Sequence, residues 1–148
     1  MDRVTVRWNG ERQFVGWDQA GHGVVMDAAR EHKGEGTGVR PIEMLLYGLA
    51  GCTGMDVVSI LEKKRQDVRG LTVEVTGHQR VDEYPKIYTE VEVEYVVTGF
   101  GVSAEAVRRA IELSEEKYCA VGGMIAGTVR ISTSFRVEEA DPPPREGA

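Results

Sequence analysis

Two cysteines are the residues of this chain whose chemistry stands out. Cys52 lies among small residues in "YGLAGCTGMD", and Cys119 lies in "LSEEKYCAVGG", just before two glycines. A thiol attacked by a peroxide becomes a sulfenic acid, which a second nearby thiol captures as a disulfide. The pair therefore predicts redox chemistry, provided that the fold brings both sulfur atoms into one crevice.

Two other interpretations of Cys52 compete with this one. Free cysteine is among the most buried residue types, so Cys52 could simply fill space in the core. Alternatively, "AGCTG" resembles the nucleophile elbow G-x-S-x-G, but that motif needs a strand before the nucleophile, and "PIEMLLYGLA" has a helical period. His78 is the only histidine after Cys52, so no acid–histidine pattern supplies a base. The elbow is excluded, and the packing and redox interpretations stay open.

The sequence gives no spacing signature for a metal. Neither cysteine belongs to a C-x-x-C pair, and the histidines are His22, His32 and His78, scattered along the chain. Zinc sites are recognised by closely spaced ligand pairs. We therefore expect no metal site.

Composition narrows the class of protein. The chain has 148 residues and a net charge of −6, which argues against nucleic-acid binding. No apolar run approaches the ~18–20 residues of a membrane helix. The start, "MDRVTVRWNG", lacks the pattern of a secretory signal. We expect a cytoplasmic protein, in which two cysteines do not form a permanent disulfide.

The elements that must position the cysteines follow from periodicity. "RVTVRW", "QFVGW" and "HGVVMDA" predict three strands within residues 1–28, the first two joined by a turn at "NGER". Residues 29–40 form a charged, glycine-rich loop. From Pro41, apolar residues recur every three or four positions, which predicts a helix of ~24 residues carrying Cys52.

The rest of the chain alternates between the two periods. We expect an antiparallel pair of strands over residues 71–81 and 87–99, followed by a second helix that begins after Ser103 and runs to about Cys119. A short helix is expected at "AVGGMIAG" and a last strand at "TVRISTSFRV". The fold class is α+β, with antiparallel strands and two main helices in the order β-β-β-α-β-β-α-β. We expect one domain over residues 1–139, with 41–139 as its helical and strand remainder, and a disordered tail over 140–148.

Two segments resemble a known family. "RPIEMLLYGLAGCTGMDVVSILEKKRQDV" is similar to the N-P-E-E-L-L…A-x-x-A-C block of the OsmC/Ohr superfamily of thiol-dependent peroxidases. "RAIELSEEKYCAVGGMI" is similar to its K-Y-C-P-V block, and "GHGVVMDA" and the element order support the match. The residues of the two segments are most similar to the YhfA-like branch of this superfamily.

The resemblance implies a homodimer with interleaved N-terminal strands and central helices, and two active sites at the interface. It implies that Cys52 is the peroxidatic thiol and Cys119 the resolving one. The reaction would reduce a hydroperoxide to an alcohol in oxidative or osmotic stress, and a small or lipoyl-type dithiol would regenerate the enzyme. No bound metal, haem or flavin is expected.

The acid that supports the thiolate in the family does not align with an acid in this sequence. Family members use a glutamate ten residues before the cysteine, where this chain has Ile42; the acid is Glu43. In an ideal helix nine residues turn about 900°, so Glu43 would lie on the opposite face from Cys52, ~13 Å along the axis. Glu43 is the candidate catalytic acid, with an alternative role as a first-turn acid favoured by the helix dipole.

The family's arginine has several candidates, namely Arg7, Arg12 and Arg40, any of which could instead be surface charge. Asp56, one turn after Cys52, would raise the pKa of a nearby thiol or orient an arginine. His22 could line the crevice or sit in a solvated turn.

Two functions of other classes stay open besides the peroxidase. A binding protein could hold an apolar or thiol ligand in the interfacial crevice without turnover, and a structural dimer could carry inert cysteines.

Overall fold

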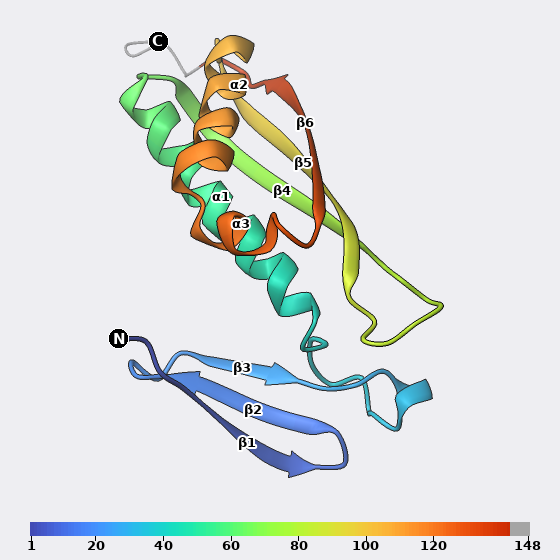
Figure 1. Cartoon of the computed structure of the whole chain (residues 1–148). Helices are drawn as coiled ribbons and strands as arrows, with labels where there is room; N and C mark the ends of the chain where they lie inside the picture. Colours follow the sequence, from blue (N-terminus) through green and yellow to red (C-terminus); the bar gives the residue numbers. More distant parts are fainter. Residues whose placement is uncertain (143–148) are drawn as a thin grey trace. The chain divides into compact units, whose positions relative to one another are not determined.

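The computed structural model describes residues 1–142, which divide into two compact units, Met1–Leu45 and the part from Leu46 onward (Figure 1). Most of the tail predicted to be disordered, residues 143–148, lies outside the described residues. The α+β fold class and the predicted order of elements are confirmed.

The first unit is a three-stranded antiparallel sheet of β1 (Val4–Gly10), β2 (Gln13–Asp18) and β3 (Gly23–Met26), with β2 in the centre. The predicted hairpin forms, and its turn lies at Glu11 and Arg12, the second half of the predicted "NGER" segment. Gly10 takes a φ of 112° at a register shift that ends β1, a conformation that suits glycine.

A buried carboxylate organises the loop predicted over residues 29–40, which also contains a single 3₁₀ turn, η1 (Arg30–His32). Asp27 accepts hydrogen bonds from the backbone amides of Ala28 (2.7 Å), Glu35 (3.2 Å) and Thr37 (3.1 Å), and from the Thr37 hydroxyl (2.7 Å). The loop passes so close to its own start that a Cβ at Gly34 would lie 1.9 Å from the Ala28 carbonyl oxygen. Glycine is therefore required there.

The second unit is built on a sheet of three long strands, β4 (Asp67–Gln79), β5 (Tyr88–Phe100) and β6 (Arg130–Glu139). β4 and β5 pair antiparallel as predicted, whereas β6 pairs with β5 in parallel. We expected antiparallel strands. The difference arises because the chain between β5 and β6 folds into helices that carry it back to the start of β5, the long crossover that a parallel pair needs.

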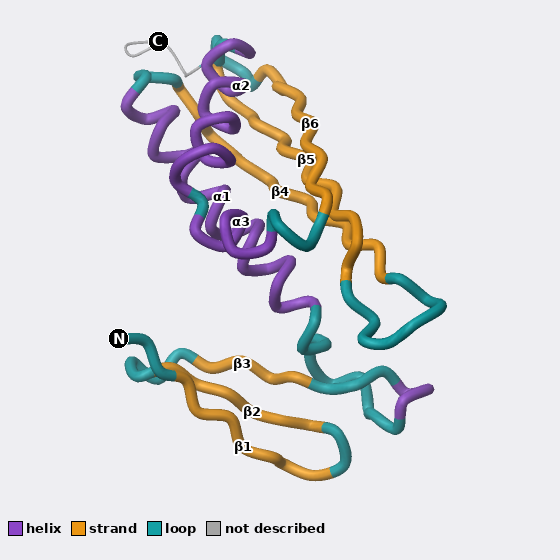
Figure 2. Tube along the Cα trace, viewed as in Figure 1, coloured by secondary structure: helices purple, strands orange, loops and turns teal. Residues whose placement is uncertain are grey.

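The helices cover one face of this sheet (Figures 1 and 2). They are α1 (Glu43–Lys63), α2 (Ala104–Leu113), a π-helical turn η2 (Ser114–Tyr118) and α3 (Ala120–Ile125). Ser103 caps α2 as predicted, because its hydroxyl accepts from the Ala106 amide at 3.2 Å. The core is the shared surface of helices and sheet, and its fully or almost fully buried side chains include Val57, Leu61, Val91, Tyr95, Val97 and Val107.

Helix α1 is long and apolar enough, by length and composition alone, to cross a membrane, although the sequence pattern predicted no such segment. The central helix of a folded domain meets the same criterion. In this chain Leu49, Thr53, Val57 and Leu61 of α1 are buried. They recur every four residues, so they form one face of the helix.

The loop held by Asp27 should depend on pH. Hydrogen bonds from the hydroxyl and then the amide of Thr37 lower the pKa of Asp27. Because the folded pKa is below that of the unfolded chain, the ionised carboxylate stabilises the loop above the ordinary aspartate pKa of about 3.9. This stabilisation is lost as the pH falls through the lowered pKa.

We expect Asp27→Asn to speed hydrogen exchange of the Glu35 and Thr37 amides at neutral pH, since one amide oxygen cannot accept from all these donors. Exchange measured by NMR should differ between the two proteins at neutral pH and converge only once the pH falls below the lowered pKa of Asp27, where the native carboxyl is also neutral. The exposed Asp82→Asn is the control. Equal exchange of native protein and Asp27→Asn at neutral pH would contradict this role.

Candidate active site

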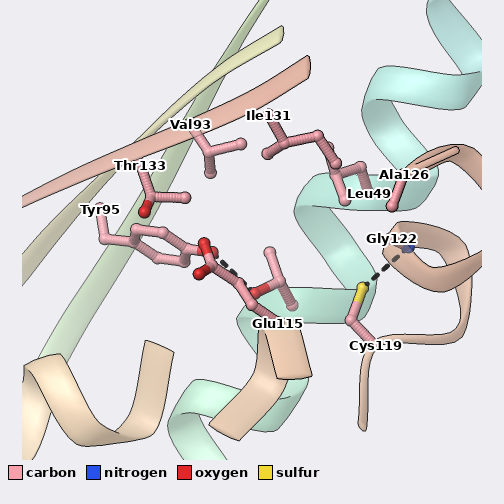
Figure 3. A pocket seen from close by; sticks show the side chains of 10 residues that line it. Leu49, Val93, Tyr95, Glu115, Cys119, Gly122, Ala126, Ile131 and Thr133 are labelled. Atoms are coloured by element: carbon pink, nitrogen blue, oxygen red, sulfur yellow. Dashed lines mark hydrogen bonds between the residues drawn. The ribbon is translucent and has the colours of Figure 1, made fainter. Parts of the chain in front are cut away.

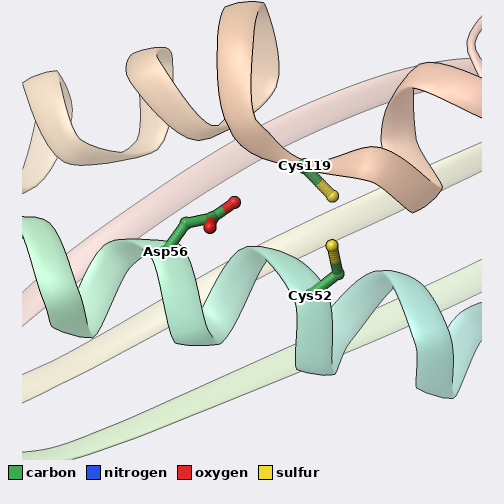
Figure 4. Close-up of side chains that lie close together, drawn as sticks. All are labelled: Cys52, Asp56 and Cys119. Carbon is green, nitrogen blue, oxygen red and sulfur yellow. The ribbon is translucent and has the colours of Figure 1, made fainter.

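The structure brings Cys52 and Cys119 together. Cys52 is half-buried in the middle of α1, and Cys119 is buried between η2 and α3. Their side chains point toward one another, with Asp56 beside them (Figure 4). The two sulfur atoms and a carboxylate oxygen of Asp56 all lie within 4.8 Å of one another. Two thiols far apart in the sequence therefore share one site.

The π-helical turn places Cys119. Its backbone amide donates to the Ser114 carbonyl at 2.8 Å, a bond that spans five residues instead of the four of an α-helix. The chain then leaves helical geometry at Cys119 and restarts as α3, where the Cys119 sulfur accepts from the Gly122 amide at 3.3 Å. The sulfur is thus held as the cap of α3.

A chain of buried hydroxyl groups supports Asp56. Ser114 Oγ donates to Asp56 Oδ2 at 2.9 Å, Thr53 Oγ1 lies 2.9 Å from Ser114 Oγ, and Tyr95 OH lies 2.7 Å from Thr53 Oγ1. These residues come from η2, α1 and β5, so this series of hydrogen bonds joins the three elements that surround the site. It fixes the carboxylate next to the sulfurs.

Thr53, Tyr95 and Ser114 were not predicted as site residues from the sequence. One signal was present for Ser114, which lies seven residues after Val107 and four after Ala110 and so continues the apolar stripe of α2. A hydroxyl on an apolar stripe needs a buried partner. Thr53 carries the same signal, because it lies four residues after Leu49 and four before Val57 on the apolar face of α1. Nothing in the local pattern identified Tyr95.

Burial determines the ionisation of Cys119. Loss of solvent is the main cause that raises the pKa of Cys119 to about 11; the hydrogen bond from the Gly122 amide opposes this rise, and the nearby Cys52 and Asp56 contribute to it. Burial likewise raises the pKa of Tyr95 to about 12. At neutral pH Cys119 is therefore a protonated thiol.

A cavity of about 200 Å³ opens beside Cys119 (Figure 3). Its walls are largely apolar, and Tyr95, Glu115 and Thr133 supply polar groups. The pKa of Glu115 is raised by burial, against a hydrogen bond from Thr133 that lowers it. The full lining is Leu49, Thr53, Val93, Tyr95, Glu115, Cys119, Gly122, Ala126, Ile131 and Thr133. The cavity thus places a small, mostly apolar space next to Cys119.

Glu43, the predicted catalytic acid, begins α1 and pairs with Arg40, one of the candidate arginines. Its Oε1 lies 2.9 Å from Arg40 Nη2, and its Oε2 accepts from the Arg40 backbone amide at 2.9 Å. The hydrogen bond from the Arg40 backbone amide and, to a smaller degree, the Arg40 guanidinium lower the pKa of Glu43. The Glu43 carboxylate thus ties the first residue of α1 to Arg40, just before the helix. Its action on Cys52 stays a prediction.

The other candidates of the first unit also have partners within it. Arg7 stacks over the Trp17 ring, 5.6 Å from its centroid, and Arg12 donates to the Glu11 carbonyl. His22 Nδ1 lies 2.8 Å from the Asp18 carboxylate in a solvent-exposed turn. A role for any of them at the thiol stays a prediction.

The chain resembles several known proteins. The sequence model of a family described as OsmC-like protein matches residues 34–134. Protein YhfA of Escherichia coli K12 is 38% identical over 138 residues, which cover 93% of this chain and 99% of the relative. The crystal structure of a hypothetical protein from Aquifex aeolicus VF5 has a TM-score of 0.83 at 32% identity, covering 95% of this chain and 98% of that one.

A more distant structure shares the fold. The organic hydroperoxide resistance protein OhrB of Bacillus subtilis has a TM-score of 0.63 at 18% identity, covering 92% of this chain and 98% of that one. The resemblance inferred from the two cysteine segments is thereby confirmed. This chain belongs to the OsmC-like protein family.

Proposed function

We propose that this protein is a thiol-dependent peroxidase that reduces organic or small hydroperoxides through a two-cysteine cycle. The observation that carries the proposal is the approach of the Cys52 and Cys119 sulfurs to within 4.8 Å, close enough for a disulfide after a small movement. The name of the Bacillus subtilis relative, an organic hydroperoxide resistance protein, supports the substrate class.

Cys52 is assigned the attacking role. The thiolate is the reactive form of cysteine, and burial keeps Cys119 protonated at neutral pH, with a pKa of about 11. Cys52 is the less buried of the two thiols. A buried, protonated Cys119 suits the second step, in which it meets a sulfur that is already electrophilic.

The cycle balances as follows. The Cys52 thiolate attacks one peroxide oxygen, the O–O bond breaks, and the departing alkoxide takes a proton to become an alcohol. Cys119 then attacks the sulfenic sulfur of Cys52, forming the disulfide and releasing water. An external dithiol, small or lipoyl-type, reduces the disulfide and is itself oxidised. The cavity beside Cys119 is the proposed route by which that thiol reaches the bond.

We also propose a cytoplasmic homodimer that acts in oxidative or osmotic stress. Large apolar side chains are exposed in both units, including Val4 at 70%, Trp8 at 63%, Met55 at 74% and Met124 at 85%. Exposed apolar groups of this size favour a protein interface. A second copy of the chain would cover them.

A binding protein is the second candidate, and the apolar cavity favours it. A cavity of about 200 Å³ whose walls include Leu49, Val93 and Ile131 suits a small apolar acyl or thiol ligand. Native mass spectrometry of the purified protein separates the two functions. A retained ligand together with thiols that hydroperoxide leaves unchanged would favour binding without turnover.

Substitution of each cysteine should give a different defect. We expect Cys52→Ser to abolish reduction of cumene hydroperoxide, because the attacking sulfur is lost. Cys119→Ser should consume about one equivalent and stop, since the sulfenic acid has no partner thiol. Turnover is followed as oxidation of the dithiol. The exposed Ser59→Ala, which should keep full turnover, is the control for losses during purification. Full turnover by Cys52→Ser would rule out the mechanism.

The raised pKa of Cys119 predicts its alkylation profile. In Cys52→Ser, the rate of iodoacetamide labelling should still climb about tenfold per pH unit beyond pH 9, whereas a free thiol levels off near its pKa of about 8.5. The rate is measured by mass spectrometry of the intact chain. A plateau near pH 8.5 would show that burial does not hold the proton on Cys119.

Glu43 is proposed to support the Cys52 thiolate through its arginine partner. We expect Glu43→Gln to slow the first oxidation of Cys52 severalfold, because the Arg40–Glu43 ion pair is broken. Stopped-flow measurement of thiol loss with excess hydroperoxide reads this step, and thermal unfolding is recorded in parallel. Lower stability at an unchanged rate would leave Glu43 as a helix cap alone.

A further inference from the structure

We propose that Cys52, Asp56 and Cys119 of the reduced protein form a binding site for Zn²⁺, with two sulfur ligands, one oxygen ligand and an open fourth position. The three side chains come from the middle of α1 and from the junction of η2 with α3, all in the second unit. This inference goes beyond the proposed peroxidase activity and does not require it.

The spacing of the ligand atoms suits the metal. Zn–S bonds of about 2.3 Å and Zn–O bonds of about 2.1 Å in a tetrahedron place ligand atoms about 3.6–3.8 Å apart. The sulfurs of Cys52 and Cys119 and the oxygen of Asp56 already lie within 4.8 Å of one another and point into one gap (Figure 4). Closing the site needs shifts of about 1 Å, which side-chain rotation supplies.

The surroundings orient the ligands as the outer groups of metal sites do. The Ser114 hydroxyl holds Asp56 Oδ2, and Thr53 and Tyr95 hold Ser114. A carboxylate has about four acceptor positions, so this bond leaves others for a metal. The Gly122 amide fixes the sulfur of Cys119. Two of the three ligands are thus positioned before any ion arrives.

The donor set selects the kind of ion. Two thiolates favour soft or borderline cations such as Zn²⁺ over Mg²⁺ or Ca²⁺, which take oxygen ligands. Cys52 is only half-buried, which leaves access for a fourth ligand. Sequence spacing did not reveal the site because its ligands assemble from two helical segments distant in the chain.

Oxidation and metal binding should exclude each other. A disulfide between Cys52 and Cys119 removes both sulfur ligands, so the ion leaves as Zn²⁺ with its charge unchanged. The electrons lost by the thiols pass to the oxidant, and binding of the ion to the reduced pair releases the thiol protons to solvent. Bound zinc would therefore protect the reduced pair.

The full chain, reduced and freed of metal under anaerobic conditions, is titrated with Zn²⁺ against a chromophoric chelator. We expect one ion per chain. Cys52→Ser or Cys119→Ser should weaken binding by at least about 100-fold, and Asp56→Asn by at least about tenfold. Ser114→Ala should weaken it by about 10–100-fold through loss of orientation. Asp67→Asn, which changes an exposed carboxylate paired with Arg69, is the matched control.

Substitution of Co²⁺ for Zn²⁺ gives a readout that does not depend on peroxidase activity or on the folding of variants. The native protein should show a tetrahedral Co²⁺ spectrum with sulfur-to-cobalt charge transfer, which is lost after oxidation to the disulfide. Absence of this band, or Zn²⁺ affinity unchanged in Asp56→Asn that folds normally, would overturn the three-ligand site. Zinc binding without peroxide reduction would refute only the proposed function; the reverse would refute only this inference.

Discussion

The contact between α1 and the turn that precedes Cys119 is the constraint on which the site depends. Thr53 and Asp56 of α1 both bond through Ser114, the first residue of the π-helical turn. Removing one member of such a buried chain leaves its partners unsatisfied, which costs about 1–3 kcal/mol per group. The same bonds that stabilise the packing therefore determine how far apart the two sulfurs lie.

The charges at this contact limit its chemistry. The neighbouring Asp56 and Cys52 add to burial in raising the pKa of Cys119, so ionisation of this thiol is disfavoured. The protein therefore treats its two cysteines unequally. One remains a neutral thiol facing an apolar cavity, and the other is left more open to solvent. This asymmetry is consistent with the proposed division into an attacking and a resolving thiol. A cation bound beside both sulfurs would favour ionisation of Cys119 by compensating the negative charges.

Much of the fold followed from local pattern, because alternation and helical period report which face of an element is buried. The strands of the first unit, the helix bearing Cys52 and the cap at Ser103 were predicted in this way. The parallel pairing of β5 with β6 was not, since alternation identifies a strand but not its neighbour or direction. The π-helical turn was also missed, because the apolar stripe of α2 continues through Ser114 as if the helix were regular. Asp56 was recognised as a neighbour of Cys52 from its spacing of four residues, whereas the partners that hold it come from β5 and η2.

The central claim is that two thiols act as one redox unit, and a disulfide map tests it most directly. Reduced protein is mixed with one equivalent of cumene hydroperoxide, quenched in acid, alkylated, digested without reductant and analysed by mass spectrometry. We expect a peptide pair joined by a bond between Cys52 and Cys119 of the same chain, with both free thiols lost together. Recovery of both cysteines in alkylated form, or a bond only between chains, would contradict it.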